Sequence, residues 1–185
     1  MTGRIPSLPP ESLGEDQRAL YDAITGGPRA QGPQHFALTR EDGSLRGPFN
    51  ALLLSPALGS ALQSVGAAIR YEGTLSARAR EIAILLVAAE WDSAFERESH
   101  EAVGAAAGLT IEELRALRDG TTSLFTGEEG VVARVVSQLA RGDLDDETWN
   151  EATAALGAQT VFELTTLVGY YATLALQLRV FGVED

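Results

Sequence analysis

The chain has 185 residues with 26 acidic and 14 basic side chains, so its formal net charge is −12. This charge would repel a polyphosphate backbone, and nucleic acid is therefore excluded as an expected partner. There is no cysteine and every basic residue is arginine, which excludes disulfides, thiol chemistry and Schiff-base or Walker lysines.

The length predicts one domain that can bury a hydrophobic core without disulfides or metals. No apolar run reaches about 18 residues, and the N-terminus lacks the basic-then-apolar pattern of a signal peptide. We therefore expect a cytoplasmic protein with no membrane partner.

The N-terminal part is predicted to hold an extended arm, one helix and a long loop. Prolines are frequent in the first ten residues, so residues 1–14 are expected to be an extended arm ahead of a domain over 15–185. A helix is expected over about 15–24, and residues 28–47, rich in Gly and Pro, predict a long loop. Three apolar residues are expected to anchor this loop: Phe36, Leu38 and Leu45.

From residue 48 onward the pattern is helical almost throughout. A helix is expected over about 56–70, and Ser76 is expected to begin another that ends near residue 90. Four Ser/Thr-x-x-Glu capping boxes predict further helix starts: Ser93/Glu96, Thr110/Glu113, Thr126/Glu129 and Thr160/Glu163. Four glycines are expected to mark helix ends: Gly108, Gly120, Gly142 and Gly157.

The last predicted helix, over about 161–181, is apolar on more than one face. Such a helix is expected to be buried in a core or in a subunit interface. Small residues at 88–89 and 104–107 predict close packing between helices. No segment shows the alternation of a strand, so the fold class is all-α, a single-domain bundle of about seven or eight helices.

The segment from Glu81 to His100 carries the side chains suited to chemistry. Glu96 and His100 are four residues apart and share a helix face, with Ser93 about two turns before His100. If two antiparallel helices meet at a break at residues 91–92, Glu81 faces His100. A carboxylate beside an imidazole fixes the tautomer, and such a pair can pass protons to a ligand.

The same residues have a structural interpretation, which their spacing alone favours. In it, Ser93 and Glu96 form only a capping box. Glu81 is an acidic residue in the first turns of its helix, where the helix dipole favours a negative charge. His100 is a hydrogen-bonded polar residue on a half-buried face. One histidine and two carboxylates are also a facial set for a divalent metal, but a capping role for Glu96 weakens that hypothesis. We expect no metal and no cofactor.

Three elements carry a resemblance to a known family. They are Arg-Glu-Ile at 80–82 before an aliphatic helix, Phe-Glu-x-x-x-His at 95–100, and Ala-Gly-Leu-Thr at 107–110 followed by Glu-Glu-Leu. Over residues 76–120 the chain resembles the core of the carboxymuconolactone decarboxylase and alkylhydroperoxidase D superfamily. The resemblance implies the all-helical alkylhydroperoxidase D fold and a homo-oligomer, either a trimer or a hexamer.

The resemblance also implies site roles. Glu81 and His100 stand where the family has its proton-relay glutamate and histidine, and Ser93 and Glu96 stand where its peroxidase branch has two cysteines. Without thiols the peroxidase mechanism is excluded. The decarboxylase branch remains, whose reaction removes CO2 from a lactone that bears a carboxylate, and a non-catalytic member that kept the fold and lost the chemistry is the alternative.

Decarboxylation of such a lactone leaves a dienolate that must be stabilised and protonated. His100 is predicted to donate the proton with help from Glu81 or Glu96. Five residues are candidates for holding the small-molecule substrate: Arg46, Asn50, Arg78, Trp91 and Phe95. Each has a structural alternative, namely a loop or surface charge for the arginines, a turn cap for the asparagine and core packing for the aromatics.

Overall fold

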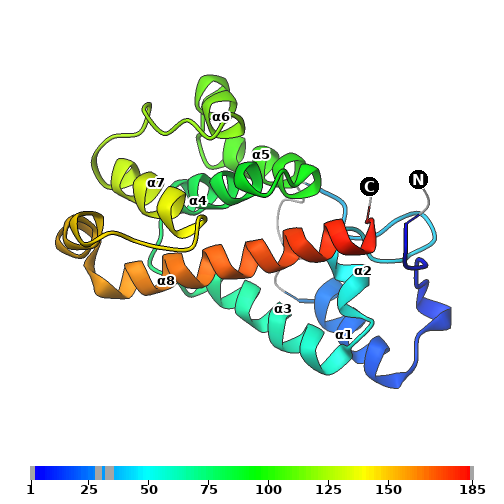
Figure 1. The fold of residues 1–185 in the computed structure, drawn as a ribbon. Helices are drawn as coiled ribbons and strands as arrows, with labels where there is room; N and C mark the ends of the chain where they lie inside the picture. The colour runs from blue at the N-terminus through cyan, green and yellow to red at the C-terminus, as the bar shows by residue number, and fades with distance from the viewer. Residues whose placement is uncertain (1–2, 28–30, 32–35, 184–185) are drawn as a thin grey trace. The chain divides into compact units, whose positions relative to one another are not determined.

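A computed structural model describes residues 3–27, 31 and 36–183, and its regular elements there are helices (Figure 1). In chain order they are η1 (Pro10–Ser12, one 3-10 turn), α1 (Glu15–Thr25), α2 (Pro48–Leu52), α3 (Pro56–Tyr71), α4 (Ala77–Glu90), α5 (Ala94–Ala106), α6 (Ile111–Arg118), α7 (Gly127–Leu139) and α8 (Asp146–Phe181). The described residues form no strand, and one isolated antiparallel bridge joins Thr39 to Leu45. The all-α fold class is confirmed. Part of the predicted loop, 28–30 and 32–35, lies outside the described residues.

The chain groups into two compact units. Unit 1 comprises Met1–Ala67 and Leu176–Asp185, and unit 2 comprises Ala68–Ala175, so α3 and α8 each contribute to both. The prediction of a single domain over residues 15–185 stays a prediction.

Unit 1 is built on one apolar cluster. Its buried members are Leu20, Ile24, Leu45, Phe49, Leu52 and Leu53. The three residues predicted to anchor the long loop do so, since Leu45 is fully buried and Phe36 and Leu38 pack against the cluster.

The N-terminal arm is fixed to its own unit. The amide of Asn50 accepts a hydrogen bond from the backbone N–H of Leu8 at 3.1 Å and donates one to the carbonyl of Pro6 at 3.0 Å. The backbone N–H of Arg4 donates to the carbonyl of Phe181 at 2.9 Å. These contacts satisfy polar groups of the arm, whose described part is extended as predicted except for the single 3-10 turn η1.

Helix α4 is the centre of unit 2 because it is apolar around almost its whole circumference. Its residues 81–88 are all buried, and α5, α6 and α7 pack against it (Figure 1). The helix begins as predicted, since the hydroxyl of Ser76 accepts a hydrogen bond from the backbone N–H of Ala79 at 3.1 Å.

The predicted capping boxes are only partly right. Thr110 and Glu113 form both reciprocal hydrogen bonds at the start of α6. Ser93 and Thr126 stand immediately before α5 and α7, as predicted, but their side chains make no capping hydrogen bond. At Ser93 and Thr126 the Ser/Thr-x-x-Glu pattern therefore predicted the helix start correctly and the capping hydrogen bonds wrongly.

The fourth capping box is wrong, because Thr160 lies inside α8. The break in α8 is at Gly157, whose φ of 82° and ψ of 155° are non-helical, and the helix resumes directly after it. Glu163 instead accepts hydrogen bonds from the backbone N–H and the hydroxyl of Thr74, at 2.7 and 2.8 Å. The other three glycines predicted to end helices also have positive φ: Gly108, Gly120 and Gly142.

Helices α4 and α5 form an antiparallel hairpin with a tight break where the sequence predicts it. Asp92 has a φ of 47°, a conformation that Asp adopts more readily than most residues, and Ser93 N–H donates to the Ala88 carbonyl at 2.9 Å. Gly104, near the end of α5, packs closely against Leu109. A Cβ at this position would lie 2.8 Å from Cδ1 of Leu109, so a small residue is favoured there.

Helix α8 is, among the described residues, the one helix long and apolar enough to cross a membrane, and half of its most apolar window is buried. A core helix of a soluble protein passes the same test of length and composition. Phe162 on this helix is 71% exposed, and Leu176 and Val180 are also exposed. The expected cytoplasmic location and homo-oligomer both stay predictions.

Candidate acid/base site

His100 and Glu81 meet inside unit 2, as their spacing predicts. Nδ1 of His100 lies 2.6 Å from Oε2 of Glu81 across the α4–α5 hairpin. Glu81 is fully buried and His100 is 5% exposed, so this is not a solvated surface pair. The contact also decides which glutamate hydrogen-bonds the imidazole, a choice that the sequence left open between Glu81 and Glu96.

Glu81 is ionised although it is buried. Burial is the largest single influence on this carboxyl and raises its pKa. The charge of His100 and its hydrogen bond, with the charges of Arg80 and Arg70, together outweigh burial and hold the pKa of Glu81 below its ordinary value. Because a carboxylate only accepts hydrogen bonds, Nδ1 of His100 must be the donor, which leaves Nε2 to exchange a proton with a ligand.

Glu96 lies on the other side of the imidazole. Its side chain is almost completely buried, and Oε2 is 3.6 Å from Nε2 of His100, close but beyond hydrogen-bond distance. The interpretation of Ser93 and Glu96 as a capping box is therefore wrong, because Glu96 turns inward along the face it shares with His100. Ser93 is buried at the start of the same helix.

Tyr171 on α8 packs against the imidazole. The two rings are 5.2 Å apart between centroids at an interplanar angle of 87°, and Tyr170 contacts Tyr171 in the same edge-to-face manner. Both tyrosines are buried, so they belong to the core and also limit how the ring of His100 can turn. Trp91 and Phe95 are half-buried, and their predicted contact with substrate stays a prediction.

Sequence reasoning missed Arg80. Its Nε lies 3.5 Å from Oε1 of Glu81, and its Nη1 donates to the carbonyl of Arg70 at 3.1 Å. Adjacent residues on a helix do not face each other, so spacing gives no reason to pair Arg80 with Glu81. The only signal was an arginine directly before a carboxylate on an apolar helix.

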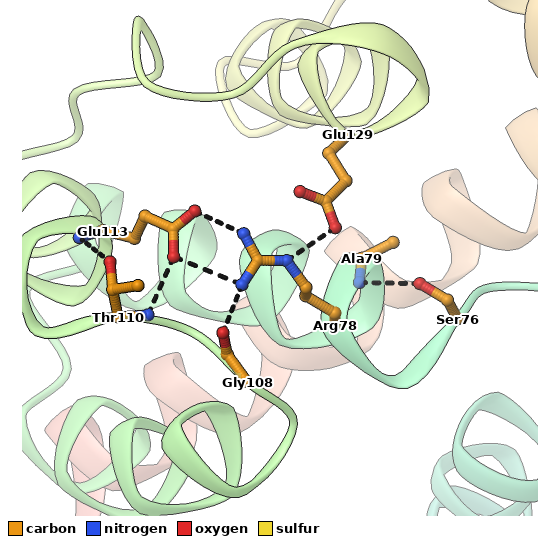
Figure 2. A network of polar contacts seen from close by, with 7 residues as sticks. All are labelled: Ser76, Arg78, Ala79, Gly108, Thr110, Glu113 and Glu129. Atoms are coloured by element: carbon orange, nitrogen blue, oxygen red, sulfur yellow. Dashed lines mark hydrogen bonds and ion pairs between the residues drawn. The ribbon is translucent and has the colours of Figure 1, made fainter.

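Arg78 joins three helices of unit 2 (Figure 2). Its guanidinium pairs with Glu113 through both terminal nitrogens, donates from Nε to Glu129 at 2.8 Å and from Nη1 to the carbonyl of Gly108 at 2.5 Å. These contacts tie the start of α4 to the starts of α6 and α7. They account for Arg78 as a structural residue and give no support to its predicted contact with substrate.

The Arg78 contacts predict an acid-sensitive contribution to stability. The hydrogen bond from Arg78 is the largest influence on Glu113 and lowers its pKa from 4.5 to about 2. Because the pKa of Glu113 is lowered, the Arg78–Glu113 ion pair contributes fully to the free energy of unfolding above about pH 4.5. This contribution is lost as the pH falls through about 2. We expect Glu113→Gln to lower the free energy of unfolding by about 1 kcal/mol at neutral pH and to match the wild type near pH 2.

Urea denaturation followed by circular dichroism at neutral pH and at about pH 2 measures this difference. Glu112→Gln, at the exposed neighbouring position, is the matched control and should follow the wild type throughout. A Glu113→Gln deficit that persists unchanged in acid would contradict the assignment.

Two other candidate residues belong to unit 1. Asn50 is buried and uses its amide to hold the N-terminal arm, so a structural role accounts for it. The backbone N–H of Arg46 donates to the Leu38 carbonyl at 2.9 Å within the loop. Contact of either residue with a substrate stays a prediction. Nη1 of Arg97 lies 3.7 Å from Oδ1 of Asp92 across the turn between α4 and α5.

The described residues include no group of three or more His, Asp or Glu side chains arranged to hold a metal ion. The facial-set hypothesis therefore gains no support from the geometry around His100. A cavity of about 280 Å³ lies elsewhere in unit 2, bounded by the C-terminal ends of α4, α6 and α7, and none of the predicted site residues lines it.

A scan against protein-family models finds no match, and a search of curated proteins finds no relative. The resemblance to the carboxymuconolactone decarboxylase and alkylhydroperoxidase D superfamily therefore stays a prediction. The candidate site stands on the geometry of Glu81, His100 and Glu96.

Proposed function

We propose that the protein is a cofactor-free acid/base enzyme whose proton-transfer group is His100, oriented by Glu81. The observation that carries the proposal is the 2.6 Å contact between Nδ1 of His100 and a fully buried carboxylate. Burying an ion pair brings little or no net stability, and well-packed apolar side chains commonly stabilise a core as well or better. A role in proton transfer explains why an ionisable pair, rather than two apolar side chains, occupies this buried position. Packing alone does not explain it.

In this proposal each group has one role. Glu81 fixes the ring so that Nδ1 keeps its proton and Nε2 points to the reacting atoms. The buried Glu81 carboxylate also stabilises the imidazolium whenever Nε2 gains a proton. Glu96, with its carboxylate 3.6 Å from Nε2, lies where it can return a proton to the ring after each turnover.

Within this class we propose a decarboxylase-like reaction on a small lactone, or related acid, that bears a carboxylate. The sequence elements at 80–82 and 95–100 support this choice of substrate class. The carbon–carboxylate bond breaks and CO2 leaves, while the electron pair enters a dienolate. His100 donates its Nε2 proton to the dienolate carbon, and the ring regains a proton from solvent or from Glu96. A cytoplasmic homo-oligomer, trimer or hexamer, is part of the same proposal.

Proton NMR of the purified protein with a panel of carboxymuconolactone-type lactones and β-keto acids tests the proposal. We expect loss of CO2 or formation of a new enol-lactone, reduced by a factor of about 10² to 10⁴ in His100→Ala. Glu98→Gln, on the exposed face of the same helix, is the control and should retain full turnover. Unchanged turnover in His100→Ala would refute the proposal, and no turnover across the panel would favour the non-catalytic alternative.

A further inference from the structure

The cavity of about 280 Å³ in unit 2 is separate from the candidate acid/base site. It lies where α4, α6 and α7 end, and none of Glu81, Glu96 and His100 lines it. We propose that this cavity binds a small organic cation, that is, a compact apolar molecule that carries one ammonium group. The inference goes beyond the proposed acid/base function and does not depend on it.

The uncharged and acidic polar groups of the cavity wall are hydrogen-bond acceptors. Two carboxylates line it, one from Glu90 at the end of α4 and one from Asp119 directly after α6. The hydroxyl of Ser137 donates its hydrogen to the carbonyl of Ala133 at 2.8 Å, so its oxygen can only accept from a ligand. A ligand that fits these groups donates hydrogen bonds, as the three N–H of a primary ammonium group do.

Two arginines also line the cavity, but both stand beside carboxylates of the protein. Arg118 donates from Nε and Nη2 to the two carboxylate oxygens of Glu101, at 2.9 and 2.6 Å. Nε of Arg141 lies 3.8 Å from Oε2 of Glu90, and the side chain of Arg141 is 73% exposed. Such an exposed and distant pair is weak, so a ligand cation can compete with Arg141 for Glu90.

The electrostatic balance at the cavity favours a cation. The carboxylates of Glu90, Asp119 and Glu101 outnumber the guanidinium groups of Arg118 and Arg141 by one, which leaves one negative charge uncompensated. Each of the three helix ends adds a partial negative charge, because the carbonyls of a last helical turn point outward along the axis. The net charge of −12 on the whole chain acts in the same direction.

The remaining residues of the wall determine the size and the apolar part of the ligand. Leu86, Ala89 and Ala140 supply apolar surface. Gly120 leaves open space, since a Cβ there would meet no atom within 4 Å. A volume of about 280 Å³ equals that of about nine liquid waters, which suits a molecule of roughly seven to ten non-hydrogen atoms. A bare metal ion would leave the apolar wall uncovered, so we infer an organic cation.

Ligand-observed NMR titration of the full-length protein tests the proposal with three matched probes. Cyclohexylammonium, cyclohexanol and cyclohexanecarboxylate share one apolar ring and differ in charge. We expect cyclohexylammonium to bind with a Kd of about 1 mM, and the neutral and anionic probes to bind about ten-fold more weakly. Added salt should weaken the binding of cyclohexylammonium, because part of the attraction is between exposed charges.

Substitutions at exposed positions should change the affinity in opposite directions. Asp119→Asn and Glu90→Gln each remove a negative charge and should raise the Kd for cyclohexylammonium about two- to five-fold. Arg141→Gln removes the cation that competes for Glu90 and should lower this Kd by a similar factor. Glu112→Gln, at the opposite end of α6, is the matched control and should leave the Kd unchanged.

Ala140→Phe locates the binding, because a phenyl group at this position fills the cavity and should abolish binding of cyclohexylammonium. If this variant does not fold, the charge variants still decide. The proposal is overturned if Arg141→Gln and Asp119→Asn bind cyclohexylammonium as Glu112→Gln does, or if a folded Ala140→Phe binds it like the wild type. Tighter binding of cyclohexanecarboxylate would overturn it in favour of an anion site. Absence of saturable binding of cyclohexylammonium up to about 20 mM would also overturn it.

Discussion

His100→Ala is expected to lower the free energy of unfolding by about 3 to 5 kcal/mol near pH 8. The substitution removes the hydrogen-bond donor of a fully buried carboxylate, and breaking one half of a buried pair leaves an uncompensated charge. Loss of the packing between the imidazole and Tyr171 adds to the cost. Urea denaturation followed by circular dichroism measures the change.

The dependence on pH separates this effect from a simple cavity. In the wild type the lowered pKa of Glu81 gives a contribution that is present above the ordinary value of 4.5 and is lost as the pH falls. His100→Ala removes the two largest influences that lower the pKa of Glu81 and leaves the burial that raises it, so we expect this pKa to rise and less of the stabilisation to remain as the pH increases. The deficit should therefore be larger near pH 8 than near pH 5, and a constant deficit would contradict this account.

A double substitution is the matched control. Replacing both partners, as in Glu81→Leu with His100→Leu, removes the buried pair and fills its space with apolar side chains. Such replacements are commonly neutral or stabilising, and we expect the double variant to be within about 1 kcal/mol of the wild type. A double variant as unstable as His100→Ala would mean that the pair is needed for folding rather than for chemistry.

Glu81→Gln is expected to reduce kcat by a factor of about 10² to 10⁴ while the fold is retained. The glutamine side chain has nearly the shape of glutamate but can donate an N–H to Nδ1 of His100. The ring would then be a neutral imidazole with its proton on Nε2, which is a much weaker acid than the imidazolium that donates in the proposed reaction, and the imidazolium would lose its counter-charge. In the Asp–His pair of serine proteases the equivalent change costs about 10⁴ in kcat.

Three measurements distinguish an orienting role from general damage. kcat should fall far more than KM changes, because Glu81 has no direct contact with substrate in the proposed mechanism. The ¹⁵N shifts of His100 should show the proton moved from Nδ1 to Nε2. Glu98→Gln, an exposed carboxylate on α5, should retain both kcat and the wild-type tautomer. An unchanged kcat in Glu81→Gln would remove Glu81 from the mechanism.

The corrections to the sequence-based account concern side chains whose choice of partner depends on other helices. Glu96 fits a capping box with Ser93 in sequence, yet it turns inward toward His100. Glu129 fits the same pattern with Thr126 and instead accepts from Arg78, an arginine 51 positions earlier. A capping box is worth about 1 kcal/mol, so a nearby imidazole or guanidinium competes with it successfully.

The sequence by itself determined the helices, the break at Asp92 and the meeting of Glu81 with His100. These follow from local rules, since helix periodicity and a tight turn bring residues at similar distances from the break together. The tertiary structure alone decided that the guanidinium of Arg80 lies beside Glu81 and that Arg78 joins three helices. Long arginine side chains reach partners on any neighbouring element, and only the packing of those elements determines which carboxylate or carbonyl lies within reach.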